Sequence, residues 1–483
     1  MKVAILGTGI AGSSVIKHLI DAKLDDLETI HVFEKLDQVG KGLPYQADSD
    51  QLLMNSYVGD LGFDQDPDHY LKWLSRHYPK YARSQCFSPR SIFGEYLADY
   101  FSDYYHDVKV QIFHEEVQAI SQEANCYHLK AEQSGHQGPY QAVFLAIGHP
   151  PYADHYHLIG SKNYIHHPYP LDQKLKSITP RDKVAIIGSG LTGIDIMRYL
   201  QLTLGASKSQ PISFFIPKDP FSTAKYEKLD DALQIGLNDQ WLKEQGEELT
   251  LDQIINQFHQ DMLLNGIDFQ RLKKDYGAGT FEQVMLAIER EDHQLSLLQL
   301  YFRQLTSLFP DLFNALSQSD QARFFKEYRS IFEHFRSQMP EESLELLNKW
   351  HQDGQIRLIH HAQSIKVVEN SFELYSKQGL ADKVDIVINA GGFEMNLSKA
   401  IKQDPFLKQA FESGLIQAHP LGGIKVTWPQ GQVIDQKGKI HDDLYLMGAW
   451  ISSTQLGNNN THLTYEQGER AVQDFINRSS AHN

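Results

Sequence analysis

Two glycine-rich turns are the stretches of this chain whose residue types and spacing best support chemistry. Gly7, Gly9 and Gly12 stand in G-x-G-x-x-G spacing, and residues 188–193 repeat that spacing. In such a turn the first glycine permits a tight bend, the second lets the backbone approach a pyrophosphate, and the third lets a helix lie close to a strand. The free N–H groups at the start of that helix then attract phosphate. Two such turns predict two bound dinucleotides, one as an electron store and one as an electron source.

Each turn is expected to follow a buried parallel strand and to begin a helix. The apolar run Val3–Leu6 predicts a strand, and Ser13–Ile20 has helical spacing. Around the second turn, Lys183–Ile187 and Ile194–Leu200 repeat the same order of strand and helix. The repeated setting argues against an accidental glycine cluster. It predicts an α/β fold with two Rossmann-like dinucleotide-binding domains.

The residue after the next strand of each unit indicates which nucleotide it binds. The first such strand, Thr29–Phe33, ends at Glu34, roughly 20 residues after the glycines, where a ribose hydroxyl needs an acceptor. Because this turn opens the chain, we expect FAD here, although these residues alone also allow NAD. The second such strand, Ile212–Ile216, ends at Pro217-Lys218 without a carboxylate. Lys218 is expected to pair with a 2′-phosphate, which favours NADPH over NADH, unless it is a solvated loop charge.

The positions of the motifs predict where the two domains begin and end. We expect an FAD-binding domain over residues 1–175 and 385–483, with an NAD(P)-binding domain over 176–384 between its two parts. Leucine-rich stretches with three-four spacing predict a helical insertion at about residues 223–345. Those stretches are Leu229–Leu242, Leu251–Leu264, Leu295–Phe309 and Ala322–Phe335.

Two smaller features are predicted within the FAD-binding domain. Three alternating stretches, Val108–Phe113, Val117–Ile120 and Tyr127–Ala131, predict a small antiparallel sheet. Near the end of the chain, Thr464 and Gln467 have the spacing of a capping box, which predicts the start of a last amphipathic helix.

The composition argues against several classes of partner and site. The formal net charge of -16 disfavours nucleic acid and anionic membrane surfaces. The chain runs from Met1 straight into a strand, and it has no apolar run of transmembrane length, so we expect a cytoplasmic protein. Two separate cysteines, Cys86 and Cys126, argue against a dithiol flavin reductase and a cysteine-rich metal site. No metal site is expected.

Taken together, the motifs resemble the two-dinucleotide flavoprotein monooxygenases and, more closely, a bacterial family of FAD/NAD(P)-binding proteins. The shared motifs stand at Gly42–Tyr45, Leu52–Asn55, Asp66–Leu74, Pro89–Leu97, Gly148–Pro151 and Arg329–Pro340. The resemblance implies an FAD-dependent oxidoreductase that takes hydride from NAD(P)H. It further implies a flavin monooxygenase acting on a small polar or amino-acid-like substrate, because some relatives hydroxylate amine nitrogens of amino acids. The chain departs from the family pattern where Gln51–Asn55 is one residue longer and where Pro217-Lys218 replaces two arginines.

The resemblance also predicts which residues meet the cofactors and the substrate. Arg90, His334 and Arg336 are expected to face the substrate, since two arginines suit a carboxylate, although each alone could equally form a surface ion pair. The flavin ring is expected near Asn55 and the start of the last helix. The full predicted cofactor set is Gly7, Gly9, Ile10, Ala11, Gly12, Glu34, Lys35, Met54, Asn55, Gly148, Gly188, Gly190, Leu191, Thr192, Gly193, Lys218, Gly448, Thr461 and His462.

Three functions stay open at this point. The first is a flavin monooxygenase, and the second is a flavin reductase or dehydrogenase that inserts no oxygen. The third is a non-catalytic protein that binds FAD or NAD(P) as a ligand. The substrate and the oligomeric state do not follow from the sequence.

Overall fold

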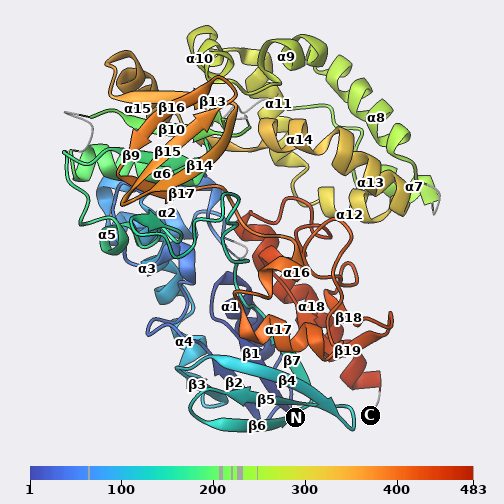
Figure 1. Cartoon of the computed structure of the whole chain (residues 1–483). Coiled ribbons are helices and arrows are strands. Elements are labelled where there is room, and N and C mark those ends of the chain that lie inside the picture. Colours follow the sequence, from blue (N-terminus) through green and yellow to red (C-terminus); the bar gives the residue numbers. More distant parts are fainter. Residues whose placement is uncertain (64–65, 206–209, 219–220, 226–231, 247–248, 482–483) are drawn as a thin grey trace.

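Two parallel sheets form the framework of the computed structural model (Figure 1). It describes residues 1–63, 66–205, 210–218, 221–225, 232–246 and 249–481. The larger sheet lies in the lower half of Figure 1, and its six strands follow the order β18-β19-β7-β1-β2-β3. These strands are β1 (Lys2–Leu6), β2 (Thr29–Phe33), β3 (Val110–Phe113), β7 (Ala142–Leu145), β18 (Gln432–Ile434) and β19 (Ile440–Leu446). All neighbours are parallel except β18 and β19.

The second sheet has five parallel strands in the order β13-β10-β9-β17-β8. They are β8 (Tyr164–Ile165), β9 (Val184–Ile187), β10 (Ile212–Ile216), β13 (Ile356–His360) and β17 (Ile386–Asn389). β1, β9 and β10 are buried nearly throughout because both faces of each sheet are covered, one by helices and the other largely by a small antiparallel sheet, which explains their continuous apolar runs. β8 and β17 belong to this sheet although the predicted boundaries at 175 and 385 assign both strands to the FAD-binding domain.

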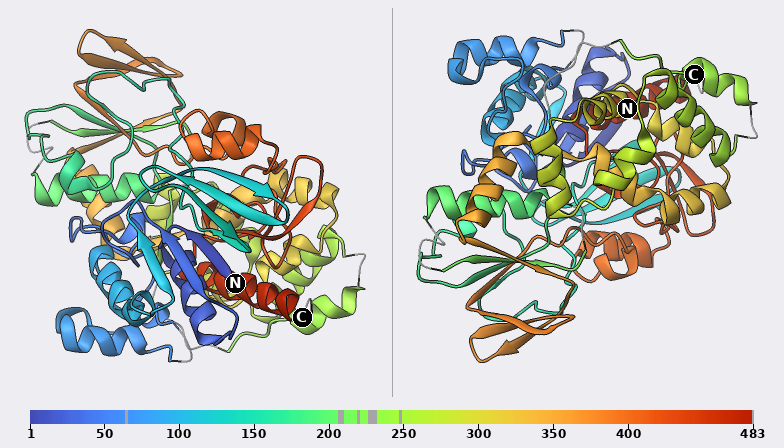
Figure 2. Two further views of the ribbon diagram at one scale, coloured as in Figure 1. Left: turned by 90° about the horizontal axis from the view of Figure 1, so that it is seen from below. Right: turned by 90° about the horizontal axis from the view of Figure 1, so that it is seen from above.

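A helix follows each glycine turn and packs on its sheet. α1 (Ile10–Asp21) follows the first turn, and α6 (Leu191–Arg198) follows the second. The last helix, α18 (Thr461–Ala481), lies beside α1, as Figure 2 shows, and the Ser14 hydroxyl donates to the Tyr465 carbonyl at 2.6 Å. The two ends of the chain therefore build one layer on the six-stranded sheet.

Short helices complete the two sheet units. They are α2 (His69–His77), α3 (Arg90–Tyr100), α4 (Ser102–Tyr105), α5 (Leu171–Lys174), α15 (Glu341–Gln352), α16 (Leu397–Ala400) and α17 (Pro405–Glu412). Within the described residues, no helix combines the length and the hydropathy needed to cross a membrane.

Each unit also carries a three-stranded antiparallel sheet. The first contains β4 (Val117–Glu123), β5 (Cys126–Ala131) and β6 (Gly135–Tyr140), and the second contains β14 (Ala362–Val368), β15 (Ser371–Ser376) and β16 (Gly379–Val384). The prediction that Val108–Phe113 belongs to the small antiparallel sheet is wrong. Its residues Val110–Phe113 form β3, which pairs in parallel with β2, and β6 takes the third place instead.

The helical insertion lies between two short parallel strands, β11 (Thr223–Lys225) and β12 (Gln338–Pro340). Its helices are α7 (Asp239–Gln245), α8 (Leu251–Leu264), α9 (Phe269–Tyr276), α10 (Phe281–Arg290), α11 (His293–Gln304), α12 (Phe309–Asn314), α13 (Gln318–Glu327) and α14 (Arg329–Arg336). Of the helix predicted over Leu229–Leu242, the described residues contain only α7. Residues 232–237 are not helical, and residues 226–231 lie outside the described residues. The predicted helix Ala322–Phe335 is interrupted at Tyr328.

Candidate functional site

The first glycine turn contains two glycines that packing requires and one that it does not. Gly7 has φ +96°, and a Cβ there would lie 2.2 Å from the Ala146 carbonyl oxygen. A Cβ on Gly12 would lie 2.0 Å from the Gly7 carbonyl oxygen, so α1 could not approach β1. At Gly9 the nearest atom to such a Cβ is Gly42 Cα at 3.7 Å, and φ is -65°. Packing and backbone conformation both tolerate a side chain at Gly9, so its absence favours close approach by a ligand.

The predicted phosphate-binding groups stand directly after Gly9. Ile10 and Ala11 are the first residues of α1, so their N–H groups have no acceptor within the helix. The free N–H groups and the positive end of the helix dipole suit a pyrophosphate at this point. The turn therefore has the geometry that the sequence predicts.

Glu34 occupies the predicted place after β2, and its carboxylate also holds the turn. Glu34 Oε2 accepts hydrogen bonds from the Thr8 backbone N–H (2.8 Å) and the Thr8 hydroxyl (2.7 Å), and Oε1 accepts from the Leu36 N–H (3.0 Å). Thr8 is a residue that the motif did not single out, because it occupies a variable position of the spacing. Lys35 instead forms an exposed ion pair with Glu116 at 3.1 Å.

Two further glycines border the same edge of the six-stranded sheet. Gly148 follows β7 and Gly448 follows β19, with φ of +78° and +86°. Among the described residues, no atom lies within 4 Å of a Cβ built on either glycine. The strand order reverses between β1 and β7, and ligands of open α/β sheets bind at such a switch point. Gly448 and Gly148 thus border open space at the edge that carries the first glycine turn, where a dinucleotide would lie.

The N-terminus of α18 is held toward this edge by two asparagines. Asn460 Oδ1 accepts from the N–H groups of His462 (2.9 Å) and Leu463 (3.1 Å), and Asn458 Nδ2 donates to the Gly448 carbonyl at 2.7 Å. Thr461 is the first residue of the helix, and His462 Nε2 lies 3.0 Å from the Asp60 carbonyl oxygen. The run of three asparagines was visible in the sequence, but its capping role was not predicted.

The predicted capping box of Thr464 and Gln467 is wrong. α18 begins three residues earlier, and the Thr464 hydroxyl donates to the Asn460 carbonyl at 2.9 Å. Gln467 is buried and donates to the Pro429 carbonyl at 3.1 Å. Asn460 takes the capping role because its short side-chain amide reaches the free N–H groups from outside the helix.

Arg336 reaches this N-terminus from the helical insertion. Its Nη2 donates to Asn459 Oδ1 at 2.6 Å, and its guanidinium lies against Gly457 and over the Phe332 ring at 5.8 Å. The buried Nε has no hydrogen-bond partner among the described residues. The neighbouring Glu333 pairs with Arg329 at 2.7 Å. Arg336 thus brings a donor group without a paired carboxylate to the start of α18.

The other two residues predicted to face the substrate have protein partners. Arg90 Nη1 lies 2.7 Å from Asp195 Oδ2, and Arg90 Nε donates to the Leu53 carbonyl at 3.0 Å. His334 is 2% exposed, and its ring nitrogens lie 3.1 Å and 2.9 Å from the carbonyl oxygens of Phe221 and Tyr276. Burial lowers the pKa of His334, although both carbonyl contacts oppose that shift. The structure therefore brings only Arg336, and neither Arg90 nor His334, to the start of α18.

Two of the family motifs meet in space, which explains why they occur together. Leu53 forms an isolated antiparallel bridge with Pro89, and the Met54 N–H donates to the Ser88 carbonyl at 2.9 Å. Met54 is buried and Asn55 is half-buried beside it. The bridge fixes the segment 52–55 that is predicted to face the flavin ring.

The second glycine turn repeats the geometry of the first. Gly188 has φ +99°, and a Cβ there would lie 2.8 Å from the Ala390 carbonyl oxygen. A Cβ on Gly193 would lie 3.0 Å from the Gly188 carbonyl oxygen, whereas a Cβ on Gly190 would have no atom of the described part of the chain within 4 Å. The turn lies between β9 and β17, where the order of the five-stranded sheet reverses. This site therefore also places an unobstructed glycine at a switch point.

The remaining predicted contacts surround this second turn. Leu191 and Thr192 are the first residues of α6, and Lys218 is exposed just beyond the end of β10. Gly392, which follows β17 with φ +85° and open space around it, was not among the predicted contacts. The signal in the sequence was a glycine shortly after an apolar strand, the same pattern that identified Gly148.

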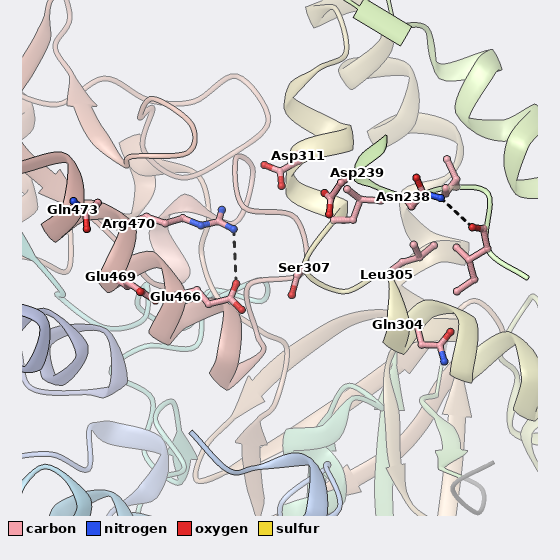
Figure 3. Close-up of a pocket in the computed structure, with 13 residues that line it drawn as sticks. Asn238, Asp239, Gln304, Leu305, Ser307, Asp311, Glu466, Glu469, Arg470 and Gln473 are labelled. Atoms are coloured by element: carbon pink, nitrogen blue, oxygen red, sulfur yellow. Dashed lines mark hydrogen bonds and ion pairs between the residues drawn. The ribbon is translucent and has the colours of Figure 1, made fainter. Parts of the chain in front are cut away.

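A separate open cleft of about 770 Å³ lies between α18 and the helical insertion (Figure 3). Figure 3 shows Glu466 and Arg470 of α18 facing Ser307 and Asp311, and the Glu466–Arg470 ion pair measures 3.8 Å. Burial raises the pKa of Glu466. None of the residues predicted from the motifs lines this cleft.

Comparison with known sequences finds a family model that matches the first part of the chain. Residues 4–150 match the family model for FAD-NAD(P)-binding proteins. A stretch of 110 residues is 27% identical to an uncharacterised protein, YdhS, of Escherichia coli (strain K12), and it covers 21% of this chain. The match spans about a fifth (20%) of that protein's length.

Solved structures similar over nearly the whole chain include three monooxygenases. The ornithine N-hydroxylase of Kutzneria sp. 744, with FAD, NADP and L-ornithine, has a TM-score of 0.58 at 14% identity and 99% coverage of both chains. The FAD-bound cadaverine monooxygenase of Erwinia amylovora has a TM-score of 0.62 at 11% identity, covering 99% of this chain and 94% of the other. The L-lysine 6-monooxygenase of Pseudomonas syringae has a TM-score of 0.62 at 14% identity, covering 98% and 99%.

At these identities the likeness establishes the fold. The family match covers the first glycine turn, Glu34 and Gly148, so it includes the edge of the larger sheet described above. Residues 4–150 are therefore similar to the FAD-NAD(P)-binding family model, and the chain as a whole has the α/β fold of these solved monooxygenase structures.

Proposed function

We propose that this protein is an FAD-dependent oxidoreductase that takes hydride from NAD(P)H and acts as a monooxygenase on a small amino-acid-like substrate. FAD binds at the six-stranded sheet, and NADPH or NADH binds at the five-stranded sheet. The corresponding domains follow the predicted order, with their boundaries moved so that β8 and β17 lie in the NAD(P)-binding domain.

The residues at the larger sheet fit FAD. Gly9 presents the N-terminus of α1 without a side chain, and Gly148 and Gly448 border open space at the same edge. Glu34 stands after β2, and its carboxylate accepts two hydrogen bonds from Thr8. A lone pair that these bonds leave unused can accept a hydrogen bond from a ribose hydroxyl. FAD, when bound, supplies hydride acceptance and the reaction with oxygen.

Groups of the protein itself stabilise developing negative charge and position the substrate. The N-terminus of α18, where Asn460 caps the N–H groups of His462 and Leu463, stabilises negative charge that develops beside it through the positive end of the helix dipole. Asn458 ties that N-terminus to Gly448, so the helix start is fixed relative to the sheet edge. The Arg336 guanidinium anchors a substrate carboxylate, because it is held at this point by Asn459 and has no carboxylate partner among the described residues.

The placement of Arg336 at the start of α18 is the observation that carries the amino-acid assignment. Ornithine and lysine, the substrates named for two similar structures, have a carboxylate, and cadaverine, named for the third, has none. Lysine and cadaverine differ only in that carboxylate. They therefore form a matched pair that tests what Arg336 recognises.

The experiment measures NADPH oxidation, oxygen consumption and hydroxylamine formation with each amine and with none. We expect L-lysine or L-ornithine to stimulate NADPH oxidation and to yield hydroxylamine, with cadaverine at least tenfold less effective, because it cannot pair with Arg336. Oxidation that proceeds with an artificial acceptor but never yields a hydroxylated product would instead support a reductase or dehydrogenase. Protein that takes up neither FAD nor NADPH would support a non-catalytic role for the fold.

A further inference from the structure

A cavity of about 330 Å³ inside the helical insertion is not used by the proposed chemistry. We call it the helical cavity, and α8, α9, α11, α12 and α14 form most of its wall. The lining is aliphatic and aromatic, with residues such as Ile255, Phe258, Phe302 and Phe313. Its volume falls in the range of about 300–1,000 Å³ that small-molecule sites occupy. An apolar cavity of only about 150 Å³ can stay dry and bind benzene, so this one suits an apolar ligand.

Apart from Tyr301 and Tyr328, the polar residues that line the helical cavity come from two adjacent helices. His259 lies on α8, and Gln270 and Lys273 lie three residues apart on one face of α9. Gln270 and Lys273 are exposed, so they mark the mouth, whereas Leu312 and Phe313 are buried at the interior. No hydrogen bond or ion pair engages the side chains of His259, Gln270 or Lys273 among the described residues. The mouth therefore offers unpaired donors above an apolar interior.

The charge of the lining selects the head group of the ligand. No Asp or Glu belongs to the described residues that line the helical cavity, although the chain has a formal net charge of -16. Lys273 is the charged lining residue, and an ammonium at the end of a flexible stem attracts a carboxylate. Lys273 would repel a cationic head group, and no carboxylate among the described lining residues would offset that repulsion.

We propose that the helical cavity binds a small carboxylic acid whose apolar chain or ring enters the interior and whose carboxylate meets Lys273. The inner wall of the cavity reaches the loop before α18. Leu456 lines the wall and precedes Gly457, which contacts Arg336, and Phe332 lies under the Arg336 guanidinium. A ligand in the helical cavity would therefore lie next to the loop that contacts Arg336 before the start of α18. The inference goes beyond the proposed function, and its test needs no NAD(P)H.

The test measures binding of decanoate to the FAD-loaded full-length protein by isothermal titration calorimetry. Acetate and decyltrimethylammonium serve as probes of the head group alone and of the opposite charge. We expect decanoate to bind at least tenfold more tightly than either probe. Equal affinity for decanoate and the cationic chain, or no uptake of decanoate, would overturn the proposal.

Two variants on one helix then locate the site. Ile255→Trp should fill the helical cavity and weaken decanoate binding at least tenfold, whereas Leu263→Trp adds the same side chain to α8 at a position that is 79% exposed and outside the lining. Lys273→Glu should also weaken decanoate binding tenfold and should improve binding of decyltrimethylammonium. Circular dichroism confirms that each variant is folded. If Ile255→Trp and Leu263→Trp bind decanoate as the unmodified protein does, the ligand lies elsewhere and the proposal is wrong.

A second copy of the chain is the competing occupant. Sedimentation velocity with and without decanoate separates the two. Association that Ile255→Trp abolishes, in protein that takes up no decanoate, would show that the cavity receives another copy, and the proposal would fail.

Discussion

Arg90 Nη1 lies 2.7 Å from Asp195 Oδ2, and this ion pair joins the two nucleotide-binding units. Arg90 begins α3 beside the larger sheet, and Asp195 belongs to α6, the helix that follows the second glycine turn. The Tyr169 hydroxyl donates to the same Asp195 oxygen at 2.6 Å. Arg198 on α6 also donates to the Gln51 carbonyl at 2.9 Å. The helix that would meet NAD(P)H is therefore bonded to the segment that is predicted to face the flavin.

The first prediction follows from the burial of this pair. Arg90→Met should lower the free energy of unfolding by about 3 kcal/mol, because removing one partner leaves a buried carboxylate without its counter-charge. Arg76→Met, at an exposed position of α2, is the matched control and should change stability by less than about 0.5 kcal/mol. Urea unfolding measures both. Equal losses in the two variants would show that the Arg90–Asp195 pair does not join the units.

The second prediction uses the two glycines that packing does not require. Gly9→Val should abolish flavin retention, and Gly190→Val should retain flavin while raising the KM for NADPH at least tenfold, because each new side chain occupies the place of one pyrophosphate. Each variant is the control for the other. Flavin absorbance after gel filtration and steady-state kinetics are the measurements. Flavin retained in Gly9→Val, or an unchanged KM in Gly190→Val, would remove the corresponding nucleotide from the proposed site.

The third prediction concerns Arg336. Arg336→Met should leave flavin content unchanged and lower the preference for lysine over cadaverine at least tenfold, since the guanidinium pairs only with the carboxylate. Arg329→Met on the same helix is the control, because Arg329 is paired with Glu333 at the surface. The ratio of kcat/KM for the two amines is the measurement. A variant that keeps the full preference for lysine would place the carboxylate elsewhere.

The fourth prediction concerns pH. His31 on β2 is 7% exposed, and burial, with a smaller contribution from Lys2, lowers its pKa to about 4. At a pH between the folded pKa and the ordinary pKa of about 6.5, His31 is protonated in the unfolded chain but neutral in the folded protein. The free energy of unfolding therefore falls as the pH falls through this range. His31→Gln should reduce the loss of unfolding free energy between pH 6.5 and pH 4.5 by about 2 kcal/mol.

Urea unfolding at the two pH values tests this. His136→Gln, on an exposed position of β6, is the control and should lose as much stability as the unmodified protein. If His31→Gln loses stability in the same way as that control, His31 does not titrate between these pH values.

Local patterns in the sequence predicted the parts of the fold that depend on local physics. β1, β2, β9 and β10 lie where apolar runs end in a turn or a charged residue, because strands covered on both faces must be apolar nearly throughout. α8 has the predicted bounds because Thr250 and Gln253 form a capping box at its start. The order of these strands and glycines was enough to predict two dinucleotide-binding units.

The parts that could not be predicted depend on partners far apart in the chain. Nothing near Arg90 in sequence indicates that its partner is Asp195, which lies on α6 more than 100 residues later. β3 pairs with β2 at the edge of the larger sheet. The alternation of residues within Val108–Phe113 does not indicate which strand this segment pairs with. Several residues near the start of α18 could cap it, and the local sequence does not show that Asn460, and not Thr464, takes that role.

The central claim is that the two glycine turns hold FAD and NAD(P)H so that electrons pass from one to the other. The most direct test is the visible absorption spectrum of the purified protein, loaded with FAD and titrated with NADPH or NADH without oxygen. We predict a bound-flavin spectrum that bleaches with one equivalent of NAD(P)H and returns when oxygen is admitted. Protein that retains no FAD, or bound flavin that neither NADPH nor NADH reduces, would contradict the claim.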